Sequence, residues 1–266
     1  QDFQQTIYRG RRYRKRIEEV IRYSNKTVTV SGKLMRIAEV KLGIDPKKIS
    51  VIANGIDPGE LSLKKSGAGG RYEGRTVILS VSHLERIKGL DLNIRAISHL
   101  KDRFPDLYYL IIGEGEERDA LELLVKDLHL EDRVEFLGEL PHHEAMEYMS
   151  CCDIFSLPSW NEGFGVVYLE AMGHGKPVIG CRGEGIDGTV RDRETGMLAE
   201  PRSVESLADS MDYLLSNRAE ADRIGMNAKK LVLENYTWEK SAQTLLALYG
   251  KITGGNQQEI RNDNGV

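Results

Sequence analysis

Hydrophobic and polar residues follow an alternating rhythm that becomes regular from Thr76 onward. Short β-branched or apolar runs there predict buried parallel strands at 76–81, 108–112, 134–137, 154–157 and 177–181. Between these runs apolar residues recur at helical spacing, as Leu90, Ile94 and Ile97 do after the first strand. This repeated order predicts an α/β fold with a doubly wound parallel sheet that carries helices on both faces.

The first 60 residues repeat the same alternation on a smaller scale. Their predicted elements are a basic helix at 8–22, a strand at 27–30, a helix at 33–42 and a strand at 49–53. A stretch rich in glycine, serine and lysine follows and has the composition of a linker. The predicted organisation is a partial first domain at 1–60, a linker at 61–74, a complete second domain at 75–235, a last helix at 236–252 and a flexible tail at 253–266.

Composition and charge narrow the class of protein. The net charge of −4 gives no reason to expect nucleic acid as a partner. The three cysteines, Cys151, Cys152 and Cys181, are too few and too irregular for a disulfide framework, so free thiols and a cytoplasmic location are predicted. No apolar run reaches the roughly 18 residues of a membrane-spanning helix. The chain opens at Gln1 without a methionine, and we interpret it as a fragment.

The most informative motif is a pair of carboxylates, Glu162 and Glu170, on either side of a glycine-rich turn at 163–165. Glycines at such a turn leave backbone N–H groups accessible, and the helix that follows offers its N-terminus to an anion. A simpler interpretation is a helix cap with a solvated glutamate at each end. The strand before the motif and its glycines favour a binding site for a sugar and its leaving group.

Lys88 follows the first strand of the same unit. Because the carboxyl ends of parallel strands meet at one edge of the sheet, Lys88 is expected near the glutamates, where a cation can neutralise a diphosphate. An isolated lysine is more often an exposed turn residue. Gly113-Glu114-Gly115 follows the second strand. Its glycines either let a ligand come close to the backbone or form a simple turn. It lacks the full G-x-G-x-x-G pattern of a dinucleotide site.

Two charged clusters remain. His142-His143-Glu144 invites a metal hypothesis, but adjacent histidines on a helix point in different directions, and no further ligands follow at metal spacing. We therefore interpret this cluster as solvated residues at a helix start and predict no bound metal. The basic run from Arg9 to Arg16 is either a solvated helix face or a surface for an anionic membrane or a lipid phosphate.

Together these motifs give a family resemblance that runs from about Thr27 to Tyr249. The chain resembles the retaining, nucleotide-sugar-dependent glycosyltransferases of GT-B fold, the glycosyltransferase group 1 family. The segments that carry the resemblance are Val51–Asp57, Leu84–Gly89, Phe136–Gly138, Pro158–Gly165, Glu170–Met172, Asp192–Gly196 and Tyr236–Trp238.

The resemblance implies an enzyme of two Rossmann-like domains, of which the second binds a nucleoside-diphosphate sugar and the first binds a glycan or lipid-linked acceptor. It implies retaining sugar transfer in glycan, polysaccharide or glycolipid biosynthesis, without a metal or other cofactor. The basic run from Arg9 to Arg16 favours an acceptor at a membrane surface, with which the protein would make peripheral contact. The implied site residues are Glu162 as the catalytic carboxylate at the sugar, Gly163, Phe164, Gly165 and Val166 at the sugar and distal phosphate, Glu170 at the ribose, His83 and Lys88 at the diphosphate, and Leu140 beside the base.

The sequence also departs from the family. Many members carry an acid where this chain has Gly188, and Asp187 lies next to that position. Most of the acceptor domain is expected to lie before Gln1. An isolated nucleotide-sugar-binding module without activity is therefore the alternative function. A nicotinamide-dependent oxidoreductase is a third interpretation, which the missing glycine pattern disfavours.

His83 stands where the family often has arginine, which generates a prediction about pH. A neutral histidine adds no positive charge opposite a diphosphate, so donor affinity should fall as histidine loses its proton. Donor binding should be measured from about pH 6 to 8, on either side of the value at which a free histidine titrates. A flat profile would contradict this role for His83.

Overall fold

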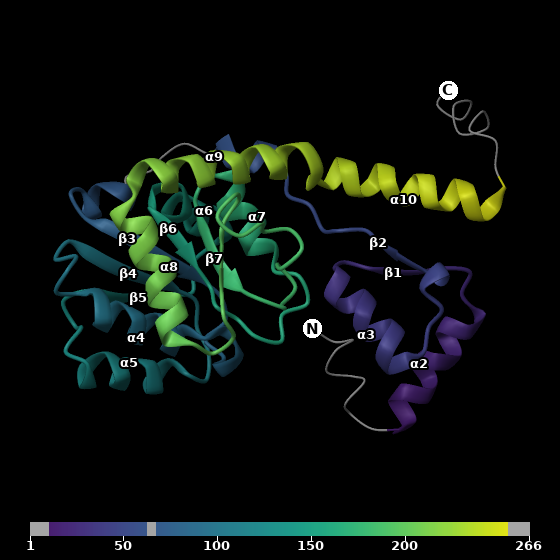
Figure 1. Ribbon diagram of the computed structural model, residues 1–266, viewed down its shortest axis with the longest axis horizontal. Coiled ribbons are helices and arrows are strands. Elements are labelled where there is room, and N and C mark those ends of the chain that lie inside the picture. Colours follow the sequence, from purple (N-terminus) through teal and green to yellow (C-terminus); the bar gives the residue numbers. More distant parts are fainter. Residues whose placement is uncertain (1–10, 63–67, 255–266) are drawn as a thin grey trace.

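The computed structural model describes residues 11–62 and 68–254, which form a larger and a smaller α/β unit (Figure 1). The larger unit holds a parallel sheet of six strands. In their order across the sheet these strands are β5 (Val134–Gly138), β4 (Leu107–Ile112), β3 (Thr76–Val81), β6 (Ile154–Ser156), β7 (Val178–Cys181) and β8 (Met197–Ala199). The five predicted strands are confirmed, whereas β8 was missed because none of its three residues is β-branched.

The strand order reverses direction between β3 and β6. Counted along the unit, the order is 3-2-1-4-5-6, which is that of the Rossmann fold. The loops after β3 and β6 therefore turn to opposite faces of the sheet and leave a crevice between them. The predicted α/β class and the doubly wound parallel sheet are confirmed.

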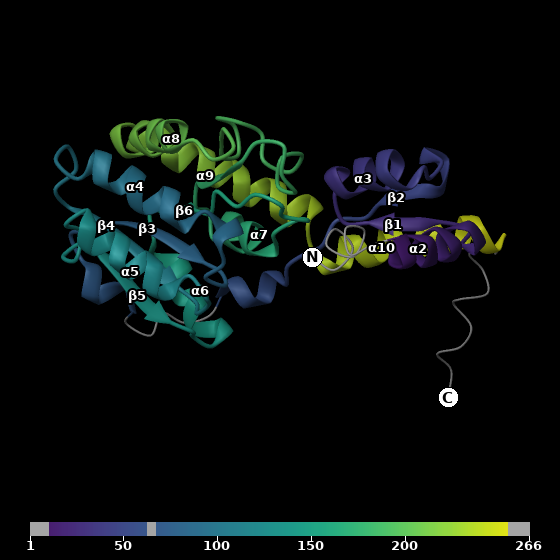
Figure 2. The same cartoon turned by 90° about the horizontal axis from the view of Figure 1, so that it is seen from below.

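Helices cover both faces of this sheet. The bounds are α4 (Leu90–Leu100), α5 (Arg118–Asp127), α6 (His142–Cys151), α7 (Val166–Gly173), α8 (Val204–Ser216) and α9 (Arg218–Asn235). The pairs α4–α8, α4–α5, α6–α7 and α7–α9 are in contact. Figure 2 shows α4 and α8 on one side of the sheet and α6 on the other.

The smaller unit consists of a two-stranded parallel sheet and two helices. Its elements are α2 (Arg11–Tyr23), β1 (Thr27–Thr29), α3 (Gly32–Leu42) and β2 (Ile49–Val51). Ala38, Leu42, Ile44 and Ile49 form its core, against which Ile17 and Ile21 of α2 pack. The predicted elements of the first 60 residues are thus present, except that residues 8–10 of the first helix lie outside the described residues.

The connections between the units are ordered by specific contacts. A short 3₁₀ helix at Pro58–Ser62 runs into the predicted linker, and a second at Ala68–Tyr72 lies within it. Tyr72 is buried, and its Oη donates to Glu135 Oε2 at 2.9 Å. The predicted last helix is α10 (Trp238–Thr253), which extends along the smaller unit (Figure 1). At its start the N–H of Ile56 donates to the Tyr236 carbonyl, and the N–H of Trp238 donates to the Ile56 carbonyl. The domain boundaries stay predictions, and the tail from residue 255 lies outside the described residues.

A fully buried polar network joins the strands at the point where the sheet order reverses. Asn93 of α4 donates through Nδ2 to Tyr109 Oη at 2.9 Å and to the Ser156 carbonyl at 3.1 Å, and its Oδ1 accepts from Ser156 Oγ at 2.8 Å. Ser80 of β3 binds Tyr109 Oη and the Ser156 carbonyl. These four side chains have no exposed surface, so each depends on the others for its hydrogen bonds.

Asn93→Ala should lower the free energy of unfolding by about 2 to 4 kcal/mol, because it leaves several buried polar groups without partners. Urea denaturation followed by circular dichroism measures the change. Arg95→Ala on the exposed side of the same helix is the control and should stay within about 0.5 kcal/mol of the unchanged protein. A similar small effect for Asn93→Ala would show that the network does not stabilise the sheet.

Candidate functional site

The loop after β3 delivers Lys88 to the crevice. Lys88 ends a 3₁₀ turn (Arg86–Lys88), and its Nζ lies 2.8 Å from Glu162 Oε2. The two side chains are only 9% and 12% exposed. Sequence reasoning placed both residues at this sheet edge, and the structure brings them into direct contact. Because each charge is nearly buried, removing either one would leave the other uncompensated at a large cost in stability.

The loops after β3 and β6 are also joined through their backbones. The N–H of Trp160 donates to the Ile87 carbonyl at 2.9 Å. Gly89 has φ +69°, and a Cβ at this position would lie 2.7 Å from the Pro158 carbonyl oxygen, so only glycine allows the loops to come this close. The Lys88–Glu162 ion pair is therefore supported by direct contacts between the two loops.

The glycine-rich turn before α7 behaves differently at each position. Gly163 is engaged within the protein: its N–H donates to Glu162 Oε1 at 3.2 Å, and its carbonyl accepts from Ser31 Oγ at 2.6 Å. Phe164 is buried in the core. Gly165 has φ +83° and precedes Val166, the first residue of α7. Because this N-cap has no side chain and the first turn has no acid, the first amides of α7 keep their capacity to bind an anion.

A pocket of about 320 Å³ lies at the carboxyl ends of β3 and β4, and Glu170 of α7 is part of its lining. It brings together three residues that the resemblance implied, His83, Leu140 and Glu170. The full lining is Val81, Ser82, His83, Ile112, Gly113, Glu114, Glu139, Leu140, His142, Ala145, Met146 and Glu170. Ser82 is one of the lining residues, and its Oγ is buried without a hydrogen-bond partner.

The glycines of Gly113-Glu114-Gly115 serve close packing of the protein itself. Gly113 has φ +132°, and a Cβ there would lie 1.9 Å from the Ser82 carbonyl oxygen. A Cβ on Gly115 would lie 2.5 Å from the Leu84 carbonyl oxygen. The segment therefore forms a tight turn against the loop after β3, and because Gly113 and Glu114 also line the pocket, the approach of a ligand stays a prediction.

The carboxyl group of Glu170 is partly buried in the wall of the pocket. Burial raises the pKa of the Glu170 carboxyl group, and the negative charge of Glu60 raises it further, whereas His142 lowers it. His142 Nε2 lies 3.4 Å from Glu60 Oε2 and 4.0 Å from Glu170 Oε1. His142 is 52% exposed at the start of α6, as the sequence predicted, and it also lines the pocket beside Glu170.

The other candidate residues of the sequence, His143 and the cysteines, do not form a metal site or a disulfide in the described part of the chain. His143 is exposed and lies 4.0 Å from Glu144. Within residues 11–62 and 68–254, no three His, Cys, Asp or Glu side chains come together as a set that could hold a metal ion. All three cysteines are free, as predicted. In the same described part of the chain, no helix has the length and apolar character needed to cross a membrane.

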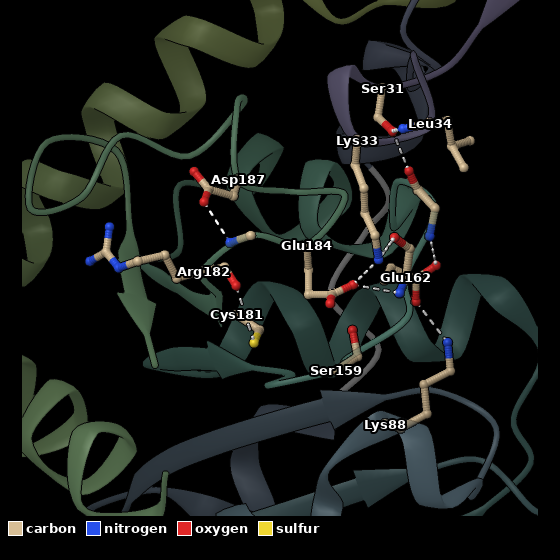
Figure 3. Close-up of polar contacts among 12 residues, drawn as sticks. Ser31, Lys33, Leu34, Lys88, Ser159, Glu162, Cys181, Arg182, Glu184 and Asp187 are labelled. Atoms are coloured by element: carbon tan, nitrogen blue, oxygen red, sulfur yellow. Dashed lines mark hydrogen bonds and ion pairs between the residues drawn. The ribbon is translucent and has the colours of Figure 1, made fainter. Parts of the chain in front are cut away.

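Sequence reasoning missed a second pair of charges at this site. Glu184, in the loop after β7, accepts from the N–H of Glu162 at 2.9 Å and forms an ion pair with Lys33 of α3 (Figure 3). Lys33 Nζ also lies 3.2 Å from the Glu162 carbonyl oxygen. The only sequence signal for Glu184 was its position after a strand at the same sheet edge, and no pattern connects Lys33 with a residue 151 positions away.

Known proteins show the same architecture. HepE of Anabaena, in a crystal structure with UDP-glucose, superposes with a TM-score of 0.80 at 22% identity, over 90% of this chain and 68% of that one. This likeness confirms the GT-B fold. An uncharacterized glycosyltransferase of Methanocaldococcus jannaschii is 30% identical over 234 residues, which are 85% of this chain and 60% of that protein.

A second relative is the GDP-mannose-dependent alpha-(1-6)-phosphatidylinositol monomannoside mannosyltransferase of Mycolicibacterium smegmatis, 30% identical over 181 residues, which are 65% of this chain and 47% of that protein. The chain thus spans about half to three fifths of the length of these two relatives. Residues 63–231 match the model of the family described as "Glycosyl transferases group 1". The chain therefore belongs to the glycosyl transferases group 1 family.

Proposed function

We propose that this chain carries the donor-binding half of a retaining glycosyltransferase. The enzyme would transfer a sugar from a nucleoside-diphosphate sugar to an acceptor hydroxyl in glycan, polysaccharide or glycolipid biosynthesis. One observation carries the proposal: at the reversal point of the sheet, the buried Lys88–Glu162 pair lies at the start of the helix whose Glu170 lines the adjacent pocket. The names of relatives that use GDP-mannose or bind UDP-glucose support a nucleotide sugar as donor but leave the base open.

The pocket suits the nucleoside part of the donor. Its volume of about 320 Å³ lies at the lower end of the range for small-ligand sites. Glu170 can accept hydrogen bonds from two ribose hydroxyls, and the unsatisfied Ser82 Oγ offers a further polar contact. The base would lie against the backbone near Leu140.

The diphosphate would be held by positive charge from both loops. Lys88, His83 and the first amides of α7 at Gly165 and Val166 can stabilise the negative charge that develops on the departing diphosphate. In this proposal they take the place of a metal ion, and no other cofactor takes part.

Glu162 holds Lys88 before the donor arrives, at 2.8 Å between Oε2 and Nζ. A diphosphate that binds Lys88 replaces this carboxylate, which becomes available to the sugar. In the structure, the N–H of Gly163 donates to Glu162 Oε1. Movement of the Glu162 carboxylate away from Lys88 would also free this N–H. Glu162 would then either orient a sugar hydroxyl or stabilise the positive charge of an oxocarbenium-like transition state.

A donor-binding module without activity is the alternative function. The observation that favours it is that the chain spans only 47% and 60% of the two relatives described above. Thermal-shift and calorimetric titrations with UDP, GDP and ADP and their sugar conjugates test for binding. Release of nucleoside diphosphate from a sugar nucleotide tests for catalysis. Binding without release supports the module, and absence of binding contradicts both functions.

The two glutamates should respond differently to removal. Glu162→Ala should lower the rate of nucleoside diphosphate release strongly, by about 100-fold, while nucleoside diphosphate affinity stays or rises because Lys88 loses its competitor. Glu170→Ala should mainly weaken donor binding, by about tenfold, through loss of charge-assisted hydrogen bonds. His143→Ala on the exposed start of α6 is the control and should change neither quantity. Equal, small effects of both glutamate variants would refute the assignment.

The acceptor is proposed to lie at an anionic membrane surface, to which the protein would bind peripherally. Arg12, Arg14, Lys15 and Arg16 are all exposed on α2, and Tyr13 between them is 47% exposed. Arg9 lies outside the described residues. Basic residues close to an anionic surface contribute about 1 kcal/mol each to binding.

This surface can be tested with vesicles. Arg12→Glu/Arg16→Glu should weaken co-sedimentation with vesicles that contain anionic lipid by about tenfold or more, because two attractive charges become repulsive. Neutral vesicles and the variant Lys229→Glu, on α9 of the larger unit, are the controls. Equal binding of all variants to anionic vesicles would contradict a role for α2.

A further inference from the structure

The backbone of Glu162 is held by a carboxylate from a third loop. Glu184 follows β7, and its Oε2 accepts from the N–H of Glu162 at 2.9 Å. The side chain of Glu184 is 15% exposed, so water competes little for this bond. A charged acceptor on a backbone amide is among the stronger hydrogen bonds in proteins. Glu184 thus fixes the position from which the Glu162 side chain extends.

The smaller unit holds Glu184 in turn. Lys33, in the first turn of α3, forms an ion pair with Glu184 and a hydrogen bond of 3.2 Å to the Glu162 carbonyl (Figure 3). Ser31, the N-cap of α3, donates to the Gly163 carbonyl at 2.6 Å while its Oγ accepts from the N–H of Leu34. Two residues at the start of α3, Ser31 and Lys33, therefore bind the carbonyls of Gly163 and Glu162.

The fit between the loops leaves little room for other arrangements. A Cβ on Gly185 would lie 2.5 Å from the carbonyl carbon and oxygen of Gly163 and from the Phe164 nitrogen. The turn at Glu162 is consequently bounded by the loop after β7 on one side and by α3 on another, and its own carboxylate is held by Lys88.

We propose that Glu184 is a positioning residue for Glu162: its carboxylate, held by Lys33, fixes the Glu162 backbone so that the Glu162 side chain faces the donor sugar. This role rests on the proposed function, because it gives Glu162 a sugar to contact. It also gives a role to a carboxylate in the loop at 183–188, which follows β7. Because Lys33 belongs to the smaller unit, the arrangement forms only when α3 lies against the turn.

Two measurements on the whole 266-residue chain test the proposal. Hydrogen exchange followed by mass spectrometry reports on the peptide that contains Glu162, without any ligand. Calorimetry gives the ratio of affinities for a sugar nucleotide and its nucleoside diphosphate, which isolates the contribution of the sugar. UDP-glucose with UDP and GDP-mannose with GDP are the two probe pairs.

Glu184→Ala should speed exchange in this peptide by about tenfold and lower the sugar contribution by about tenfold, the size expected for loss of one charge-assisted hydrogen bond. Nucleoside diphosphate affinity should change by less than about twofold. Glu184→Gln keeps an oxygen that can accept from the Glu162 N–H, so it should restore most of both quantities. This rescue separates the hydrogen bond to Glu162 from the ion pair with Lys33.

Asp187→Ala is the matched control, because Asp187 lies in the same loop and accepts from the N–H of Gly183 at 2.6 Å (Figure 3). It should leave exchange at Glu162 and the sugar contribution unchanged. Equal effects of Asp187→Ala and Glu184→Ala would show a general loosening of the loop and overturn the proposal, as would a normal sugar contribution in Glu184→Ala. Absence of nucleotide binding by the unchanged chain is a separate outcome, which overturns the proposed function and with it this role.

Discussion

The buried side chain of Asn93 fixes the geometry on which the site depends. It binds the Ser156 carbonyl and side chain of β6 and also Ser80 of β3, so the two strands at the reversal point of the sheet are held together from within. The loop that carries Lys88 leaves β3 soon after Ser80, and the turn that carries Glu162 leaves β6 soon after Ser156. Two residues 74 positions apart in the sequence therefore meet at 2.8 Å. A buried polar network of this kind tolerates few alternative strand arrangements, because each one would leave hydrogen-bonding groups unsatisfied.

The site is built from compensated charges. Lys33 pairs with Glu184, and Lys88 pairs with Glu162, so two cations and two carboxylates share a partly buried volume without a lone charge. An uncompensated charge at this depth would be costly. In the proposed function a diphosphate would displace the Glu162 carboxylate from Lys88, so donor binding would be an exchange of ion pairs. The pair that a donor would break is the one with Lys88, whereas the pair with Lys33 can persist and keep the Glu162 backbone in place.

The sequence predicts the sheet well because buried parallel strands are continuous runs of β-branched and apolar residues, as at Thr76–Val81. It also predicts the edge at which Lys88, Glu162 and Glu170 gather, since parallel strands bring their carboxyl ends to one side. It fails where structure depends on contacts between distant segments. The partners of Glu184 and His142 come from α3 and from the segment around Glu60. No local pattern encodes such contacts, because they arise only when the two units pack.

This dependence on packing gives the smaller unit a part in the donor site. Ser31 and Lys33 bind the carbonyls of Gly163 and Glu162, so the turn before α7 takes hydrogen bonds from a helix that lies outside its own sheet. The chain segment 53–56 and the start of α10 hold the units in this relation through Ser241 Oγ and the backbone of Ile56. A rotation of the smaller unit would break the bonds at Ser31 and Lys33 while leaving the Asn93 network intact. The position of Glu162 therefore depends on both units: the strands and loops of the larger unit carry its turn, and the start of α3 adds hydrogen bonds to the carbonyls of Glu162 and Gly163.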